Sequence, residues 1–243
     1  MPRRTRFDHK EDGRLLDPGV PSPRPKDAAT LILIRVAPLT RKTDVLVGKR
    51  SSRHAFMPDK YVFPGGRVEA FDGRVPAANE LHHRSEAQLA VQTRRRARAF
   101  ALTAIRETFE ETGLIVGVDK PSPKGALPAD WHPYFERGAV PDLHGLRFVG
   151  RAITPPYRPK RFDARFFMAN ADDVLIDDRP PEDGAELSDL QWVDLETAMG
   201  FDLPSVTRFM IGEIGERVAN PSAQPKPAFL RWTNSGHQMT RIF

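Results

Sequence analysis

The chain has 243 residues, of which 40% are hydrophobic and 28% are charged, a balance typical of a soluble globular protein. It contains no cysteine, which excludes disulfides, thiolate metal sites and cysteine nucleophiles. No apolar run reaches the roughly 18 residues that a membrane span needs, and the N-terminus lacks the apolar stretch of a secretory signal. We therefore expect a cytoplasmic enzyme with no membrane partner.

The net charge of +5 raises the question of an anionic partner. The basic residues are spread over the front, middle and later parts of the chain. A spread excess favours a solvated surface over a nucleic-acid groove, so we expect no nucleic-acid partner.

The predicted elements alternate along the chain. Residues 1–27 are polar and rich in proline, which predicts a flexible N-terminal arm. Apolar runs predict strands at 28–36, 45–50, 61–66, 114–118, 146–154, 164–169 and 187–193. Helical periodicity predicts helices from about 86 to 112 with a break near 94–98, at 195–199 and at 204–218. This alternation predicts an α/β fold with a mixed sheet in one domain over residues 28–219, followed by a C-terminal tail over residues 220–243.

The stretch RETFEETGL at residues 106–114 carries most of the chemistry. Glu107, Glu110 and Glu111 have helical spacing and point to one side of a helix. Gly113 suits the left-handed position that ends a helix. Carboxylates at this spacing repel one another, so the pattern predicts a bound cation. Mg²⁺ or Mn²⁺, which prefer carboxylate oxygens, are the candidate cofactors.

Gly66, Asp72 and residues 106–114 together resemble the Nudix box, G-x5-E-x7-R-E-U-x-E-E-x-G-U, in which U is aliphatic. The FPGG motif that ends at Gly66 is the usual entry to that box. Asp72 stands where the pattern has glutamate, and Thr108 stands where it has an aliphatic residue. Residues 73–105 replace the seven-residue spacer, so about 26 residues are inserted, at about 73–98.

The split box and the RFDARFF motif at residues 161–167 resemble one subgroup, the acyl-coenzyme A diphosphatases with an insertion inside the Nudix box. The resemblance implies a Nudix-type α/β/α sandwich with a mixed sheet and a helical insertion within the box. It also implies a metal-dependent hydrolase in which water attacks the phosphorus of a diphosphate. The partner would be a small, nucleotide-derived substrate.

The resemblance also assigns roles to the box residues. Glu107, Glu110 and Glu111 would be the metal ligands, and Arg106 would orient a box carboxylate through a bidentate pair. Asp72 is one methylene shorter than the expected glutamate, so it is either a ligand or an arginine partner.

Two further groups of candidates lie outside the acidic helix. The general base is open between Glu110, Glu186 and Asp183. Gly65 and Gly66 let a ligand approach the backbone closely. For substrate binding we expect contacts from Arg53, Gly65, Gly66, Arg67 and Arg161.

The interruption of the box favours coenzyme A or acyl-coenzyme A as substrate. The alternative is a Nudix pyrophosphatase acting on ADP-ribose, NADH or nucleotide sugars, since the box reports the chemistry and not the attached group. A non-catalytic Nudix-like binding module would usually lose a box carboxylate, and all three are present. The basic charge leaves an RNA-decapping-type hydrolase open, and the sequence also leaves open a homodimer.

Overall fold

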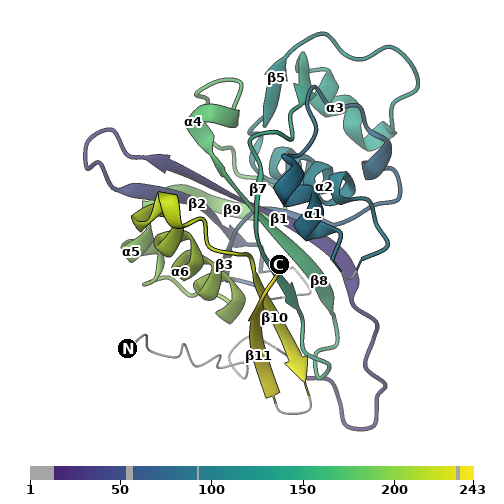
Figure 1. The fold of residues 1–243 in the computed structure, drawn as a ribbon, viewed down its shortest axis with the longest axis vertical. Coiled ribbons are helices and arrows are strands. Elements are labelled where there is room, and N and C mark those ends of the chain that lie inside the picture. Colours follow the sequence, from purple (N-terminus) through teal and green to yellow (C-terminus); the bar gives the residue numbers. More distant parts are fainter. Residues whose placement is uncertain (1–13, 53–56, 92, 234–235) are drawn as a thin grey trace.

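The structure is a computed structural model that describes residues 14–52, 57–91, 93–233 and 236–243. A mixed sheet of nine strands forms the centre of this described part (Figure 1). Its strands are β1 (Lys26–Val36), β2 (Thr43–Arg50), β3 (Tyr61–Val62), β4 (Gly65–Arg67), β7 (Arg147–Ile153), β8 (Phe162–Asn170), β9 (Leu187–Asp194), β10 (Ala228–Thr233) and β11 (Gly236–Arg241). They follow the order β11-β10-β7-β8-β1-β2-β3, with β4 also paired to β1 and β9 to β2. The pairs β1–β8 and β7–β10 are parallel and the others are antiparallel, so the sheet is mixed, as predicted.

Helices and short connections complete the fold. The α-helices are α1 (His83–Leu89), α2 (Ala97–Thr112), α3 (His132–Phe135), α4 (Ala171–Val174), α5 (Leu195–Ala198) and α6 (Ser205–Ala219). The 3-10 turns are η1 (Asp72–Arg74), η2 (Ala129–Trp131) and η3 (Pro221–Ala223). A small second sheet pairs β5 (Gly117–Asp119) with β6 (Ala139–Pro141).

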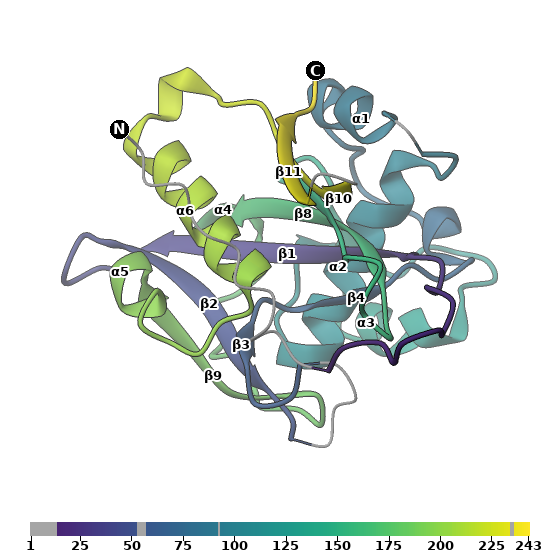
Figure 2. The same cartoon turned by 90° about the horizontal axis from the view of Figure 1, so that it is seen from below.

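The central sheet has a separate core on each face, because successive side chains of a strand point in opposite directions. Leu31 and Leu33 of β1 pack with Ile105 in the core that contains α2. Ile32 packs on the other face with Met210 of α6. Figure 2 shows α6 and α2 on opposite sides of β1. The predicted α/β/α sandwich is therefore confirmed.

The insertion in the box contains η1 and α1. The helix predicted from about residue 86 is broken between Leu89 and Ala97, close to the predicted break. The strand predicted at 61–66 is two short strands, because Pro64 has no N–H for a ladder hydrogen bond. The strand predicted at 114–118 is displaced, and β5 begins at Gly117.

Both ends of the described chain make contacts with the rest of the fold that the sequence did not predict. In the predicted arm, the N–H of Leu16 donates to the carbonyl of Tyr157 at 2.7 Å. Residues 1–13 lie outside the described part. The predicted tail over 220–243 contains β10 and β11, which extend the sheet beyond β7, and Phe229 and Leu230 are buried.

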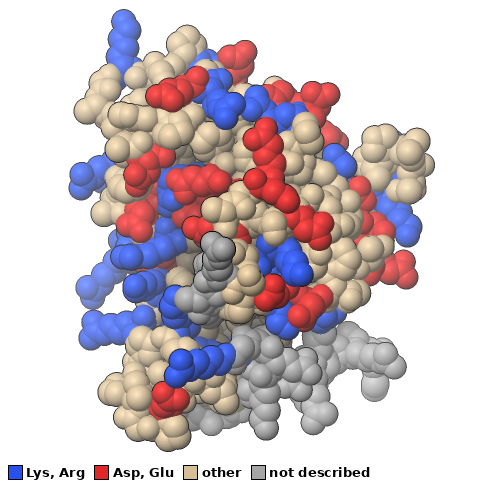
Figure 3. All heavy atoms as spheres, turned by 180° about the vertical axis from the view of Figure 1, so that it is seen from behind, with Lys and Arg blue, Asp and Glu red and all other residues tan. Residues whose placement is uncertain are grey.

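Charge is unevenly placed on the surface. Figure 3 shows lysine and arginine side chains gathered along one edge of the face turned away from the viewer in Figure 1. Among the described residues, no helix is both long and apolar enough to cross a membrane.

Candidate active site

The candidate site forms where the sheet opens beside β1. This strand pairs with β4 near its beginning and with β2 near its end. Gly65 and Gly66, at the start of β4, lie at this opening beside helix α2. The N–H of Gly65 donates a hydrogen bond of 2.8 Å to Oε2 of Glu111. A Cβ on Gly66 would lie 2.4 Å from the carboxylate of Glu107, so a larger residue there would displace that carboxylate.

Arg106 connects the box carboxylates to one another. Its side chain is only 6% exposed, and its Nη1 lies 2.9 Å from both Glu107 Oε1 and Glu110 Oε2. Nε and Nη2 donate to Asp72 at 3.0 and 3.1 Å, and Nη2 also donates to the carbonyl of Arg67 at 3.1 Å. Burial opposes the charge, but the hydrogen bonds to Asp72 and the nearby carboxylates outweigh it and raise the pKa of Arg106. This arginine therefore joins α2 to β4 and η1.

Asp72 is fully buried and accepts hydrogen bonds from five donor atoms. Oδ1 accepts from Arg106 Nε at 3.0 Å and from Trp131 Nε1 at 3.1 Å. Oδ2 accepts from the N–H of Glu69 at 2.9 Å, from Thr103 Oγ1 at 2.7 Å and from Arg106 Nη2 at 3.1 Å. Both oxygens are fully engaged, which is the geometry of an arginine partner and leaves no lone pair for a metal ion.

Of the other box carboxylates, Glu107 and Glu111 are largely buried and Glu110 is partly exposed. Burial raises the pKa of Glu107 to about 7, against the opposing effect of Arg106. Burial, with repulsion from Glu107, raises the pKa of Glu111 to about 8. Burial also raises the pKa of Glu110. A nearby cation would favour the charged form of each group.

These carboxylates suit a hard divalent cation. Within the described residues, no three histidine, aspartate or glutamate side chains are already arranged as a metal cage, and Arg106 draws Glu107 and Glu110 toward itself. The donor set fits nevertheless, because it consists of buried, mutually repelling carboxylate oxygens. Glu107 and Glu111 would hold the ion, and the charge of Glu186 acts on both.

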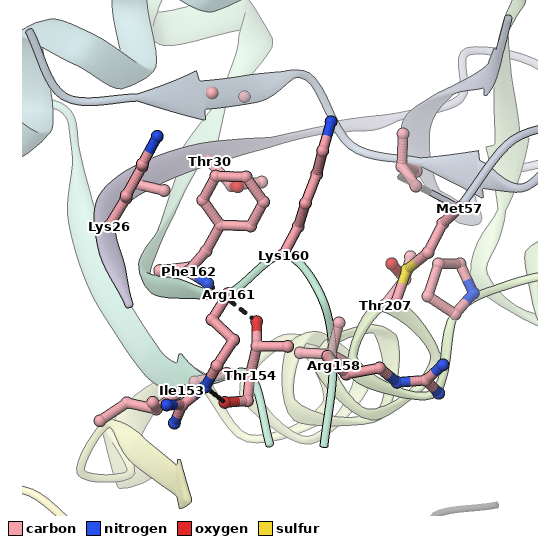
Figure 4. Close-up of a pocket in the computed structure, with 18 of the residues that line it drawn as sticks. Lys26, Thr30, Met57, Ile153, Thr154, Arg158, Lys160, Arg161, Phe162 and Thr207 are labelled. Carbon is pink, nitrogen blue, oxygen red and sulfur yellow. Dashed lines mark hydrogen bonds between the residues drawn. The ribbon is translucent and has the colours of Figure 1, made fainter. Parts of the chain in front are cut away.

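Glu107 lines a cavity of about 610 Å³. Figure 4 shows part of this cavity. The first residues of β1 and β8 and the end of β7 form one wall, and the start of α6 forms another. Glu186 lies at the same cavity. Apolar lining comes from Val62, Phe63, Phe166, Val206 and Leu230. Basic lining comes from Arg24, Lys26, Arg50, Arg67, Arg158 and Lys160.

The predicted substrate contacts have different outcomes. Gly65, Gly66 and Arg67 line the cavity, and so does Arg161. However, Arg161 Nε donates to the carbonyl of Thr154 at 2.9 Å, and its Nη1 donates to Ser22 Oγ and the Pro23 carbonyl at 2.9 and 3.0 Å. These bonds fasten the N-terminal segment to the cavity wall. Arg53 lies outside the described residues.

The three candidate bases also differ. Glu186 lines the cavity beside Glu107. Glu110 is 39% exposed and paired with Arg106. Asp183 is not part of the cavity lining, and its carboxylate accepts from the N–H groups of Leu190 and Asp189 at 3.0 and 2.9 Å, which lower its pKa. Asp183 therefore shapes the turn into β9.

Sequence reasoning missed two residues at the site. Arg50, the last residue of β2, lines the cavity, and burial lowers its pKa although Glu111, Glu186 and Glu107 favour its charge. The sequence signal that could have identified Arg50 is a basic residue at the end of an apolar strand. Trp131 donates a hydrogen bond to Asp72 at 3.1 Å, and no local sequence signature indicates this contact.

Comparisons with known proteins find Nudix hydrolases among the similar sequences and structures. A crystal structure of a Nudix hydrolase from Alicyclobacillus acidocaldarius is 26% identical to the chain, with a TM-score of 0.61, covering 78% of this chain and 90% of that one. A Caenorhabditis elegans protein named nudix hydrolase 7 is 27% identical over 181 residues, and a Gallus gallus acyl-coenzyme A diphosphatase is 27% identical over 232 residues. In both sequence and fold, the chain is similar to Nudix hydrolases. The alignments cover 70% and 69% of this chain but only 51% and 60% of the two curated relatives. No protein-family model matches the chain.

Proposed function

We propose that the protein cleaves the diphosphate bond of coenzyme A or acyl-coenzyme A, giving adenosine 3′,5′-bisphosphate and (acyl-)4′-phosphopantetheine. One observation carries the proposal: a single cavity joins Glu107 and Glu186 to an apolar wall and to a basic rim. The carboxylates match the diphosphate with its metal, and the apolar wall matches an uncharged arm. The likeness to an acyl-coenzyme A diphosphatase supports this substrate over other nucleotide derivatives.

Nudix hydrolases generally require divalent metal ions, and Mg²⁺ or Mn²⁺ is our choice for this oxygen-only site. Glu107, Glu110 and Glu111 would be the metal ligands, and Glu107 and Glu111 would contact the ion directly. A bound ion neutralises phosphoryl oxygens and favours ionisation of water. Arg106 keeps the carboxylates in position through its 2.9 Å contacts.

In the proposed reaction, water attacks one phosphorus atom and the bridging P–O bond breaks. The proton of the water passes to a carboxylate, and Glu186 is our candidate for that general base because it lines the cavity and its charge acts on Glu107 and Glu111. The leaving oxygen departs as a phosphate. Arg50 and Arg67 lie at the cavity and supply positive charge toward the phosphoryl oxygens.

The test is a substrate panel with products resolved by mass. We expect purified protein with Mg²⁺ or Mn²⁺ to convert coenzyme A to adenosine 3′,5′-bisphosphate and 4′-phosphopantetheine. Turnover of ADP-ribose, NADH or a nucleotide sugar without turnover of coenzyme A would refute the proposed substrate.

A paired variant tests the residues. Glu111→Gln keeps the hydrogen-bond acceptor for Gly65 but removes a charge from the site, so turnover should fall by about two orders of magnitude or more. Glu196→Gln is the matched control, because that side chain is 92% exposed on α5. Equal activity of the two variants would contradict the metal assignment.

A further inference from the structure

We propose that the end of the cavity remote from Glu107 is a second phosphate subsite, formed by Lys26, Lys160 and Arg24 around the ring of Phe162. It rests on the proposed function and adds to it the class of group recognised. That group is a phosphate monoester on the nucleotide half of the substrate, separate from the diphosphate that is cleaved. The 3′-phosphate of coenzyme A is such a group.

Strand register places this subsite relative to the box. Ala29 of β1 lies opposite Gly66, the residue packed against Glu107. Lys26 is three residues earlier on the same strand, which is about 10 Å along it at the usual rise per residue. Lys26 also lies beside Phe162 in the parallel pairing of β1 with β8. The register therefore places Lys26 about 10 Å along β1 from the position opposite Gly66, and Arg24 and Lys160 line the same cavity.

The side chains share the cavity. Lys26 and Phe162 are register partners and point to the same face of the sheet. Figure 4 shows the ammonium groups of Lys26 and Lys160 directed to the same side of the cavity, with the ring of Phe162 between them in this view. An aromatic ring and two lysines that line one cavity suit a phosphorylated heteroaromatic ligand, which would stack on the ring and pair with the cations.

Neighbouring acids do not neutralise these cations. Asp27 and Asp163 follow Lys26 and Phe162 by one residue, so their side chains point to the opposite face of the sheet. Asp27 pairs there with Arg95 at 2.6 Å, and Asp163 pairs with Arg151 at 2.7 Å. Among the described residues, no carboxylate forms an ion pair with Arg24, Lys26 or Lys160. A substrate phosphate would supply the missing negative charge.

The wall that carries the cations is held in place. Arg161 donates to Ser22 Oγ at 2.9 Å and to the Pro23 carbonyl at 3.0 Å, which fixes the segment leading to Arg24. The N–H of Lys26 donates to the carbonyl of Arg161 at 2.9 Å. These bonds tie the N-terminal segment to the β7–β8 connection, so the three cations come from two segments that are fastened together. Such a wall needs little ordering when a ligand binds.

The first experiment compares coenzyme A with 3′-dephospho-coenzyme A. We expect the wild-type kcat/KM to be higher for coenzyme A, and the ratio between the two substrates to fall about tenfold in the double variant Lys26→Met, Lys160→Met, because charge-assisted contacts are lost. Lys124→Met, at an exposed lysine outside the cavity lining, is the matched control and should keep the wild-type ratio. Equal kcat/KM values for both substrates in the wild type would overturn the subsite.

A second experiment separates the subsite from the proposed reaction. Calorimetric titration with adenosine 3′,5′-bisphosphate and with AMP measures binding without turnover. Tighter binding of the bisphosphate that is lost in the double variant supports the subsite even if coenzyme A is not cleaved, an outcome in which only the proposed reaction fails. Equal binding of the two nucleotides would reject the subsite even if coenzyme A is cleaved.

Discussion

Replacing Asp72 by asparagine tests the central hydrogen-bond network. An amide keeps one acceptor oxygen, which can still serve Arg106 Nε and Trp131 Nε1 at Oδ1. Its NH2 group would then face three donors that now lie 2.7 to 3.1 Å from Oδ2. The buried guanidinium of Arg106 would also lose its fully buried counter-charge.

Breaking a buried ion pair by removing one partner costs about 3–5 kcal/mol. For a domain of this size, each kcal/mol lowers Tm by about 2–4 °C, so Asp72→Asn should lower Tm by about 6–20 °C. Differential scanning calorimetry of the metal-free protein measures this directly. Asp130→Asn, at an exposed residue beside Trp131, is the control and should shift Tm by about 1 °C or less. Equal shifts in the two variants would refute the view that Asp72 holds the box together.

Other predictions concern the same site and the C-terminal hairpin. Gly66→Ala should reduce turnover by more than about tenfold with a small change in Tm, because the added Cβ displaces only the flexible end of Glu107; unchanged kinetics would argue against this contact. The raised pKa values of Glu107, about 7, and Glu111, about 8, mean that their ionisation destabilises the metal-free fold as pH rises above their ordinary value of 4.5, so the gain in Tm from Mg²⁺ should be larger at pH 8.5 than at pH 6. Phe229→Ala should cost about 3–5 kcal/mol in urea unfolding, because Phe229 is buried where β10 meets β7; a loss below about 1 kcal/mol would show that the hairpin is not part of the core.

The sequence predicted the elements whose signals are local. The apolar run of β1 and the carboxylate spacing of α2 each lie within one element, and both elements form as expected. The α/β/α class followed from the order of elements and the Nudix resemblance. These features need no knowledge of distant contacts.

Features that depend on distant contacts were not predicted. The strands β10 and β11 lack a strong apolar alternation, and β10 is stabilised by parallel pairing with β7. The role of Asp72 depends on Trp131, which lies far along the chain and has no motif that links it to the box. Nη1 of Arg161 donates to Ser22 and Pro23, so a residue expected to bind phosphate fixes the cavity wall instead.

The parallel pairing of β1 with β8 sets a condition on how the chain folds during synthesis. Lys26 to Ile34 pair with Phe162 to Asn170, so the first strand made must wait for a partner made much later. Contacts between residues so far apart in the sequence form slowly, because closing the long intervening loop costs conformational entropy. Until β8 leaves the ribosome, β1 carries an unpaired edge along its apolar run, a segment prone to association with other chains. The complete cavity, which needs both strands, therefore forms only late in synthesis.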